Sequence, residues 1–307
     1  MVPSKRVIFN TPQRLIESIP SRRIWIRNYL KDNCQLGESE YRLDLLVGEV
    51  IPYIDSPEGM AAQSLLVAFL YTYDRVDMSS TAHARALDLD EVVVALKALL
   101  RGKTGSMHRY DWYGAALLEK LCSAIRGDSH FDLFRTEMER FLDVTLVERE
   151  NRLHCRIPSV QEYFEKLRDD SCGVGPCVLT AVMFHPERHT LTADFWSTEA
   201  AREMLTLCKR IISIHNDVFG YDREKAAGDV NNFVISLSEQ MNERNALKSA
   251  CSIADGMYSG FFDLRASAGR KGLSALWDAC HCWIVGNWIW STNNSRRFSD
   301  QPGPVID

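Results

Sequence analysis

Apolar residues recur along this chain three or four positions apart, which is the spacing of one face of an α-helix. The segments 89–100 and 204–215 show this pattern over several turns. Proline, the strongest helix breaker, is absent from residues 58–157 and 187–301. Alternation of apolar and polar residues, the pattern of a half-buried strand, is hard to find over five or more positions. The sequence therefore predicts an all-α fold with long helices.

Three segments are apolar on every helical face, at 66–71, 174–184 and 280–290. A helix of this kind lies inside a bundle, because it has no polar stripe to turn toward water. No stretch of low complexity separates one part of the chain from another. We therefore expect a single all-α domain over residues 1–307, built as a helical bundle around an apolar interior.

The composition is that of an ordinary globular protein, with 46% hydrophobic and 25% charged residues among 307. A net charge of −5 gives little attraction for phosphate backbones, so we expect no nucleic-acid partner. The first residues lack the apolar stretch of a signal peptide, and no run reaches the ~20 apolar residues of a membrane span. The nine cysteines contain no pair at zinc-binding spacing, which favours reduced thiols and a cytoplasmic location.

The most informative polar residues continue the apolar helix that reaches His215. On a helix, Asn216, Gly220 and Glu224 are four residues apart and lie on one face, so an amide oxygen and a carboxylate converge there. Arg223 stands beside them. Oxygen ligands of this kind suit Mg²⁺. A solvated polar face explains the same residues without a metal, and the residues alone leave both interpretations open.

The stretch from Asn216 to Glu224 resembles the NSE motif of class I terpene cyclases, which binds one Mg²⁺ in that family. The following GDVNN, at 228–232, is similar to the family's continuation of this motif. Gly220 stands where the family has Ser or Thr, so the resemblance implies that water replaces that ligand. The implied fold is the class I terpenoid synthase helical bundle around an apolar active-site cavity.

A second acidic sequence ends the apolar helix near residue 70. Asp74 and Asp77 are three residues apart and share one helical face, where two carboxylates can bridge metal ions. Without the resemblance, an Asp-Arg-x-Asp cluster of this kind is more often a helix end with a local ion pair to Arg75. The sequence resembles a shortened aspartate-rich motif of diterpene cyclases of the cyclooctat-9-en-7-ol synthase type. The resemblance implies that Asp74 and Asp77 bind Mg²⁺, and that three Mg²⁺ ions act in all.

The segment 163–173 resembles the part of the family that senses diphosphate. By this resemblance Arg168 is the diphosphate sensor, Ser171 is the linker, and the backbone carbonyl of Cys172 is the effector at a helix break. Without the resemblance, Arg168 would be a surface arginine beside two aspartates, Asp169 and Asp170.

The C-terminal segment 286–298 is similar to the stretch that ends in the family's RY pair. Arg297 takes the place of the arginine that donates to diphosphate, and Phe298 replaces the tyrosine, which removes a hydroxyl donor. The resemblance implies that Arg168, Arg223 and Arg297 together hold the diphosphate of a linear isoprenoid.

Aromatic residues near these motifs are candidates for the cavity lining, because ring faces attract cations. They are Phe69, Tyr73, Phe184, Phe219, Trp283 and Trp288. An ordinary core position also explains each of them.

The resemblance implies a Mg²⁺-dependent cyclase, a carbon–oxygen lyase that ionises a prenyl diphosphate, cyclises the carbocation to a terpene and releases diphosphate. Local similarity to diterpene cyclases favours geranylgeranyl diphosphate, and a sesquiterpene cyclase acting on farnesyl diphosphate is the alternative. A chain-elongating prenyltransferase should show two full DDxxD motifs, and this chain has neither. A non-catalytic helical prenyl-binding protein is also left open, as is a homodimer.

Overall fold

The computed structural model describes residues 19–36, 42–77, 88–103, 113–267 and 273–293. Within these ranges every regular element is a helix and no strand occurs, which confirms the all-α prediction. The longer helices are α2 (Ile19–Cys34), α3 (Leu43–Val50), α4 (Pro57–Asp77), α6 (Leu89–Leu100), α7 (Tyr113–Ile125), α8 (Phe131–Leu153), α11 (Val174–Met183), α13 (Glu199–Ala226), α15 (Glu243–Ser267) and α16 (Leu273–Asn293). The shorter ones are α9 (Val160–Glu162), the π-helix η2 (Tyr163–Arg168), α10 (Asp169–Ser171), the 3₁₀ helix η3 (Arg188–Thr190), α12 (Ala193–Trp196) and α14 (Phe233–Ser238).

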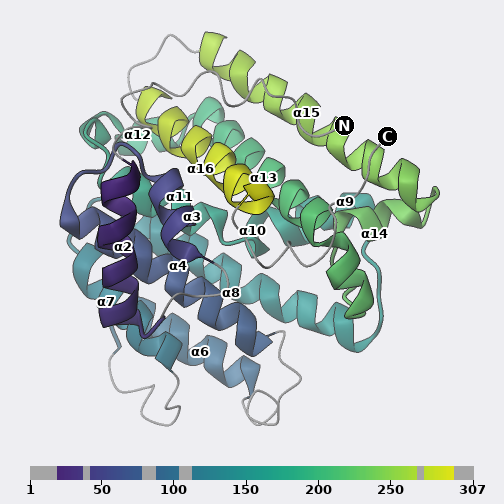
Figure 1. Ribbon diagram of the computed structural model, residues 1–307, viewed down its shortest axis with the longest axis horizontal. Coiled ribbons are helices and arrows are strands. Elements are labelled where there is room, and N and C mark those ends of the chain that lie inside the picture. The colour runs from purple at the N-terminus through teal and green to yellow at the C-terminus, as the bar shows by residue number, and fades with distance from the viewer. Residues whose placement is uncertain (1–18, 37–41, 78–87, 104–112, 268–272, 294–307) are drawn as a thin grey trace.

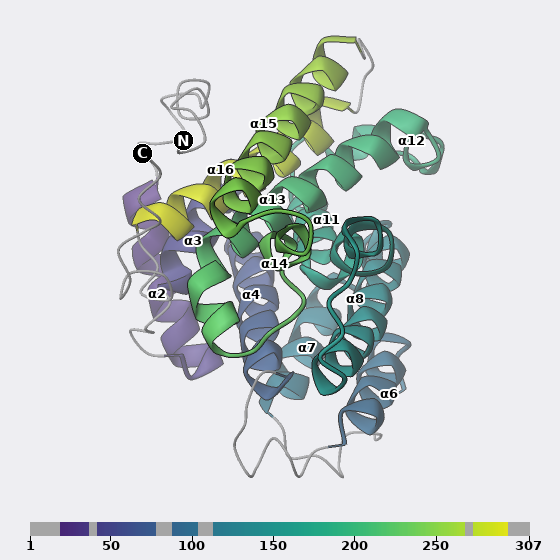
Figure 2. The same cartoon turned by 90° about the vertical axis from the view of Figure 1, so that its right-hand side faces the viewer.

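The helices form a bundle in which α4, α11, α13 and α16 are central. α15 lies along one side of the molecule over α13 and α16, and α6, α7 and α8 form the opposite side (Figure 1). The view at right angles shows the same separation, with α2 and α3 on a third side (Figure 2). α11 packs against α4, α8, α13 and α16, so it is enclosed by other helices.

The segments that are apolar on every face occupy the interior, as their patterns predict. Every residue of α11 is buried, and most residues of the apolar part of α16 are buried as well. The main core includes apolar side chains from Ile26 on α2 to Trp290 on α16. A smaller cluster around Tyr163 and Phe233 packs beneath α14 and α15. Full burial of one large apolar side chain contributes roughly 1.5–3 kcal/mol, so this core dominates the stability of the bundle.

Local sequence signals set several helix ends. The hydroxyl of Thr198 accepts a hydrogen bond from the backbone N–H of Ala201 and begins α13. α10 is separated from α11 at Gly173, whose φ of +67° lies in the left-handed region that side-chain-bearing residues rarely adopt. The predicted helix break after Cys172 is therefore present. No helix in the described ranges combines the length and apolar character that crossing a bilayer requires.

Candidate active site

A cavity of about 210 Å³ lies between α3, α4, α8, α11, α13 and α16, beside the segment formed by η2 and α10. Thirteen apolar or aromatic residues and eight polar residues line it. The apolar group is Leu43, Leu46, Val67, Leu70, Tyr71, Tyr73, Phe141, Cys172, Val174, Cys177, Ile212, Trp283 and Trp290. The polar group is Asp74, Thr145, Glu148, Arg168, Ser171, Ser213, Asn216 and Asn287.

The cavity brings together residues that are far apart in the sequence. Seven of the predicted site residues line it: Tyr73 and Asp74 on α4, Arg168 on η2, Ser171 on α10, Cys172 at the following break, Asn216 on α13 and Trp283 on α16. The aspartate-rich helix and the NSE-like helix thus present an aspartate and an asparagine to one space.

The rest of the NSE-like motif continues along α13 beyond the cavity. Glu224 is buried, and its carboxylate accepts hydrogen bonds from Asn232 Nδ2 at 2.9 Å and Arg223 Nη2 at 2.7 Å. Arg223 itself is exposed. A Cβ atom on Gly220 would collide with the Glu224 carboxylate, so that carboxylate occupies the space beside residue 220 that a Ser or Thr side chain would need.

Two predicted residues cannot be placed. Asp77 is the last residue of α4, but its side chain lies outside the described residues. Arg297 also lies outside the described residues. The proposal of three diphosphate-binding arginines therefore has structural positions for Arg168 and Arg223 alone.

Four of the six aromatic candidates are not among the residues that line this cavity, and their role stays a prediction. Phe69 is fully buried in the core, and Phe184 follows α11 and packs against Gly59 at the beginning of α4. Phe219 is half-buried on α13, and Trp288 follows the cavity residue Asn287.

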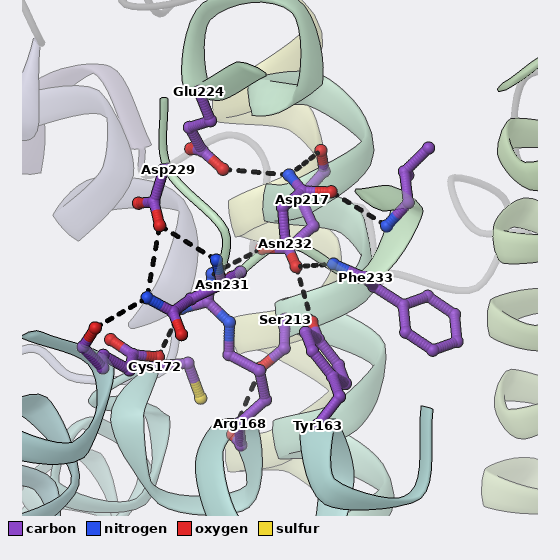
Figure 3. Close-up of polar contacts among 12 residues, drawn as sticks. Tyr163, Arg168, Cys172, Ser213, Asp217, Glu224, Asp229, Asn231, Asn232 and Phe233 are labelled. Carbon is purple, nitrogen blue, oxygen red and sulfur yellow. Dashed lines mark hydrogen bonds and ion pairs between the residues drawn. The ribbon is translucent and has the colours of Figure 1, made fainter. Parts of the chain in front are cut away.

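Arg168 is held by residues from other elements rather than by its neighbours in the sequence (Figure 3). Its Nη2 donates to Asp217 Oδ1 at 2.7 Å and to the backbone carbonyl of Asn231 at 2.9 Å. Its Nη1 lies 3.5 Å from Glu148 Oε1. The side chain is 15% exposed, so the alternative of a surface arginine is wrong.

The two aspartates that follow Arg168 pair with other basic residues. Asp169 accepts two hydrogen bonds of 2.7 Å from Arg210, and Asp170 Oδ1 lies 3.3 Å from Lys209 Nζ. Both basic residues belong to α13. The segment after the predicted sensor is therefore bound to the NSE-like helix by ion pairs.

Asp217 anchors Arg168 and is fully buried. Its Oδ2 accepts hydrogen bonds from the Tyr163 hydroxyl at 2.7 Å and from the backbone N–H of Phe233 at 2.6 Å (Figure 3). Burial raises the pKa of the Asp217 carboxyl, and the guanidinium of Arg168 opposes that shift. Burial alone would lower the pKa of Arg168, but the negative charges of Asp217 and Glu148 raise it by more. The pKa of Arg168 therefore lies well above its usual range. Arg168 therefore keeps its charge beside the cavity.

The GDVNN continuation ties this network to α8 and α13. Asn231 Nδ2 donates to the backbone carbonyl of Glu148 at 2.9 Å, and Asn151 Nδ2 donates to Asn231 Oδ1 at 2.8 Å. Asn232 Nδ2 donates to the backbone carbonyl of Asp217 and to Glu224, each at 2.9 Å. These two asparagines fix the geometry of the NSE-like helix around Asp217 and Glu224.

Several buried polar atoms of the cavity-lining residues have no hydrogen-bond partner among the described residues. These are Arg168 Nε, Ser171 Oγ, Trp283 Nε1 and Asn287 Nδ2. An unsatisfied buried polar group costs about 1–3 kcal/mol, so an arrangement of this kind points to a ligand. All four atoms are donors or can donate, which matches a ligand rich in oxygen acceptors.

The ligand set fits Mg²⁺ better than a transition metal. Within the described ranges no three His, Cys, Asp or Glu side chains cluster in a way that could hold a metal ion. Asn216 and Asp74 instead offer one amide oxygen and one carboxylate from opposite helices, with Glu224 further along α13. Mg²⁺ takes hard oxygen ligands, keeps several waters and is completed by substrate phosphates, so it does not need an all-protein cluster.

Sequence reasoning missed the roles of Glu148 and Asp217. Asp217 follows Asn216 directly, but helical geometry turns it away from the cavity toward Tyr163 and Arg168. Glu148 lies in a highly charged part of α8, where the sequence cannot separate it from a solvated face. Only the packing of η2 on α8 shows that its side chain, 8% exposed, meets Arg168.

Comparison with known proteins gives the family of this chain. Residues 65–258 match the family described as terpene synthase family 2, C-terminal metal binding. The sesquiterpene synthase Agr8 of Cyclocybe aegerita is 28% identical over 266 residues, covering 78% of this chain and 69% of that protein. Pristinol synthase of Streptomyces pristinaespiralis is 27% identical over 180 residues, covering 53% of this chain and 47% of that protein.

Two solved structures show the same fold at low sequence identity. 2-Methylisoborneol synthase from Streptomyces coelicolor, in complex with Mg²⁺ and 2-fluoroneryl diphosphate, has a TM-score of 0.77 at 16% identity, covering 97% of this chain and 95% of that chain. A variant of cucumene synthase has a TM-score of 0.77 at 19% identity, and the match covers 94% of this chain and 98% of that chain. Because the family match spans well over half of its residues, this chain belongs to terpene synthase family 2 and is a class I terpene cyclase, a carbon–oxygen lyase of the EC 4.2.3 type.

Proposed function

We propose that this chain is a Mg²⁺-dependent cyclase that converts a linear prenyl diphosphate to a cyclic terpene and releases diphosphate. The observation that carries the proposal is the cavity at which Asp74, Arg168, Ser171, Cys172 and Asn216 meet. The unpartnered polar atoms at this cavity support an oxygen-rich, anionic ligand. We also propose that residues 1–307 form one catalytic domain, while the cytoplasmic location and the homodimer stay predictions.

Farnesyl diphosphate is the substrate we propose first. The relative that covers 78% of this chain is named a sesquiterpene synthase, and that name favours a substrate of this length. Local similarity in the segments 70–77 and 286–291 favours geranylgeranyl diphosphate, which is the second candidate. The walls of the cavity accept either chain chemically, because most of them are apolar.

The residues around the cavity have two roles in ionisation, which are binding the diphosphate and binding Mg²⁺. Arg168, oriented by Asp217 and Tyr163, places a permanent positive charge next to the cavity. Asp74, Asn216 and Glu224 are the residues that would hold Mg²⁺, with Asp77 as a further predicted ligand. Bound Mg²⁺ would neutralise the negative charge that develops on the diphosphate as the carbon–oxygen bond breaks.

The apolar walls protect the carbocation after diphosphate has left. Tyr73, Phe141 and Trp283 line the cavity, and desolvated ring faces attract a cation by ~2 kcal/mol or more. The enclosing helices also exclude bulk water, which would otherwise quench the cation early. We propose that the carbonyl of Cys172, at the break after α10, faces the site of ionisation as the effector.

Diphosphate release from prenyl diphosphates of 10 to 25 carbons, with Mg²⁺ or with EDTA, tests the proposal directly. We expect Mg²⁺-dependent release together with cyclic products in mass spectrometry. Asn216→Ala and Glu224→Ala should each lower kcat by about 100-fold or more, since electrostatic stabilisation of the leaving group is lost. The helical circular dichroism should stay unchanged in both variants.

Asn245→Ala is the matched control, because Asn245 is exposed on α15. It should cyclise at the wild-type rate. Normal turnover in both Asn216→Ala and Glu224→Ala would remove the metal assignment. Tight binding of prenyl diphosphate without diphosphate release would favour the non-catalytic binding protein instead.

A further inference from the structure

A hydrogen bond between two side chains joins α4 to α8 at the wall of the cavity. The Tyr73 hydroxyl lies 2.7 Å from Thr145 Oγ1, and both residues line the cavity. Both are buried, with 1% and 4% of their surface exposed. α4 packs mainly on α2, α3, α7 and α11, whereas α8 packs mainly on α6, α10 and α11. This bond therefore connects two helices that are held in place mainly by other elements.

The direction of this bond follows from the second partner of Thr145. Thr145 Oγ1 donates a hydrogen bond to the backbone carbonyl of Leu142 at 2.9 Å. A threonine hydroxyl has one hydrogen, so Tyr73 is the donor in its bond to Thr145. The hydroxyl hydrogen of Tyr73 therefore points toward α8 and is not free to protonate a hydrocarbon in the cavity. What Tyr73 contributes to the cavity is then the position of its ring.

Two other rings pack against the ring of Tyr73. Its centroid lies 5.5 Å from that of Phe141, at an interplanar angle of 59°, and 5.9 Å from that of Phe69, at 31°. Phe141 lines the cavity from α8, and Phe69 lies in the core. Apolar packing is non-directional, so these contacts alone allow the ring to tilt. The bond to Thr145 fixes the far end of the side chain, because a hydrogen bond weakens steeply when it is bent.

The ring lies close to the residues proposed to act in ionisation. Asp74, a proposed Mg²⁺ ligand, follows Tyr73 directly on α4 and lines the same cavity. Thr145 and Glu148 are three residues apart on α8 and share a helical face, and Glu148 meets Arg168. Tyr73 is therefore at the part of the cavity wall where a newly formed allylic cation would begin to react.

We propose that Thr145 is a positioning residue that fixes the ring of Tyr73 in the cavity and thereby selects among the cyclic products. A ring attracts a cation within about 6 Å of its centroid, and the competing carbocations of a cyclisation carry their charge on different carbons. A ring that is held in one position therefore favours one branch of the reaction. This inference rests on the proposed cyclase function and deepens it, because it names a residue that determines product specificity.

The products of the wild type, Thr145→Val and Thr145→Ser test the inference. Valine keeps the shape of threonine without its hydroxyl, whereas serine keeps the hydroxyl. We expect the ratio of main product to by-products to change by about fivefold or more in Thr145→Val and by less than about twofold in Thr145→Ser. Diphosphate release by Thr145→Val should stay within about threefold of the wild-type rate, because the metal-binding and diphosphate-binding residues are unchanged.

Tyr73→Phe removes the same hydrogen bond from its other end. It should change the product ratio about as much as Thr145→Val does. The double variant should change the ratio no further than the larger single effect, because both substitutions remove one interaction. Effects that add in the double variant would show that the two residues act independently, and would overturn the inference.

Thr136→Val is the matched control on the same helix. Thr136 is exposed, and its hydroxyl donates to the backbone carbonyl of Asp132 at 2.8 Å. The control therefore also removes a bond from a threonine hydroxyl to the backbone of α8, and it should keep the wild-type product ratio. An unchanged ratio in Thr145→Val, or an equal change in Thr145→Ser, would overturn the inference and leave the proposed function intact.

Crystal structures of the wild type and Thr145→Val provide a test that needs no turnover. We expect the Tyr73 hydroxyl within hydrogen-bonding distance of Thr145 in the wild type, and a displaced Tyr73 ring in the variant. A ring at the same position in both structures would contradict the inference. Absence of Mg²⁺-dependent diphosphate release in the wild type would instead count against the proposed function.

Discussion

Arg168 shows how one side chain acquires a role through residues distant in the sequence. Its strongest partner, Asp217, is 49 residues away, and that carboxylate is itself held by the Tyr163 hydroxyl. A planar guanidinium can contact Asp217, Asn231 and the cavity in one orientation, because its donors point in fixed directions. A lysine has one flexible ammonium group and cannot make these contacts together.

Arg168→Lys should therefore lower kcat with a prenyl diphosphate at saturating Mg²⁺ by about 100-fold, since one aligned donor is worth 10²–10³ in rate at such sites. Steady-state diphosphate release measures the effect. Lys166→Arg is the control, because Lys166 is 62% exposed and pairs only with Glu162 at 3.0 Å. Exposed pairs of this kind contribute ~0–1 kcal/mol, so the control should keep its rate. Equal rates in the two variants would remove Arg168 from the site.

Gly220 is the one position where the NSE-like motif lacks a side-chain ligand. Gly220→Ala should displace the Glu224 carboxylate without supplying an oxygen, whereas Gly220→Ser displaces it and supplies one. We expect weaker Mg²⁺ binding by about tenfold in the alanine variant and recovery in the serine variant, because hydroxyl oxygen suits Mg²⁺. Calorimetric titration of MgCl₂ with inorganic diphosphate present measures both. Identical Mg²⁺ affinities in the wild type and the alanine variant would show that Glu224 does not bind the metal.

At this scale the sequence predicts residues that belong to a spaced motif and misses those that do not. Asn216 and Arg168 are predicted because the distances along the chain within their motifs are kept, and both line the cavity. Glu148 carries no such signal, since a glutamate in a charged helix is compatible with many packings. Its burial depends on which face of α8 meets η2, and tertiary contacts determine that face.

At the scale of elements, an internal ion pair positions the break between α10 and α11. Lys209 on α13 forms ion pairs with Glu137 on α8 and with Asp170 on α10, and its side chain is 8% exposed. Gly175, in the first turn of α11, lies against this pair, and a Cβ there would collide with the Glu137 carboxylate. A glycine at 175 therefore allows α8, α11 and α13 to meet next to Cys172.

Gly175→Ala should lower the free energy of unfolding by about 1–3 kcal/mol, because it overpacks a buried ion pair. Gly256→Ala should instead raise the free energy of unfolding. Gly256 lies within α15, where a Cβ would meet nothing within 4 Å, and alanine favours the helix by about 0.5–1 kcal/mol. Urea unfolding monitored by circular dichroism compares the two. A stabilising effect at residue 175 would show that Glu137 moves away without cost.

Most long helices could be predicted from periodicity, and the short irregular ones could not. The pattern at 89–100 matches α6 (Leu89–Leu100), because an apolar face and the absence of proline both favour a helix there. The π-helix at Tyr163–Arg168 leaves no comparable signal, because its hydrogen bonds shift by one residue without changing the residue types. Such segments recur at functional sites, and here one carries the cavity residue Arg168.

At the scale of the whole molecule, burial of neutral histidines couples stability to pH. His281 on α16 packs against Trp277 with ring centroids 4.2 Å apart, and its Nε2 lies 3.1 Å from the Tyr258 hydroxyl on α15. Burial lowers the pKa of His281 to about 4, and burial lowers that of His215 to about 4 as well. Protonation therefore works against the packing of α13, α15 and α16.

The sign of the pH dependence follows from proton uptake. Between pH 6.5 and 4 the unfolded chain binds a proton at each histidine and the folded chain does not, so stability is present above this window and is lost as pH falls through it. At pH 5 each histidine should lower the free energy of unfolding by about 2 kcal/mol relative to pH 7.5.

His281→Phe keeps a ring in the aromatic cluster and removes the titrating group. Between pH 7.5 and pH 5 the free energy of unfolding of this variant should therefore fall by about 2 kcal/mol less than that of the wild type. Urea unfolding at both pH values measures this difference, with His189→Gln as the control because His189 is exposed. Parallel losses in wild type and His281→Phe would show that His281 does not set the acid limit of the fold.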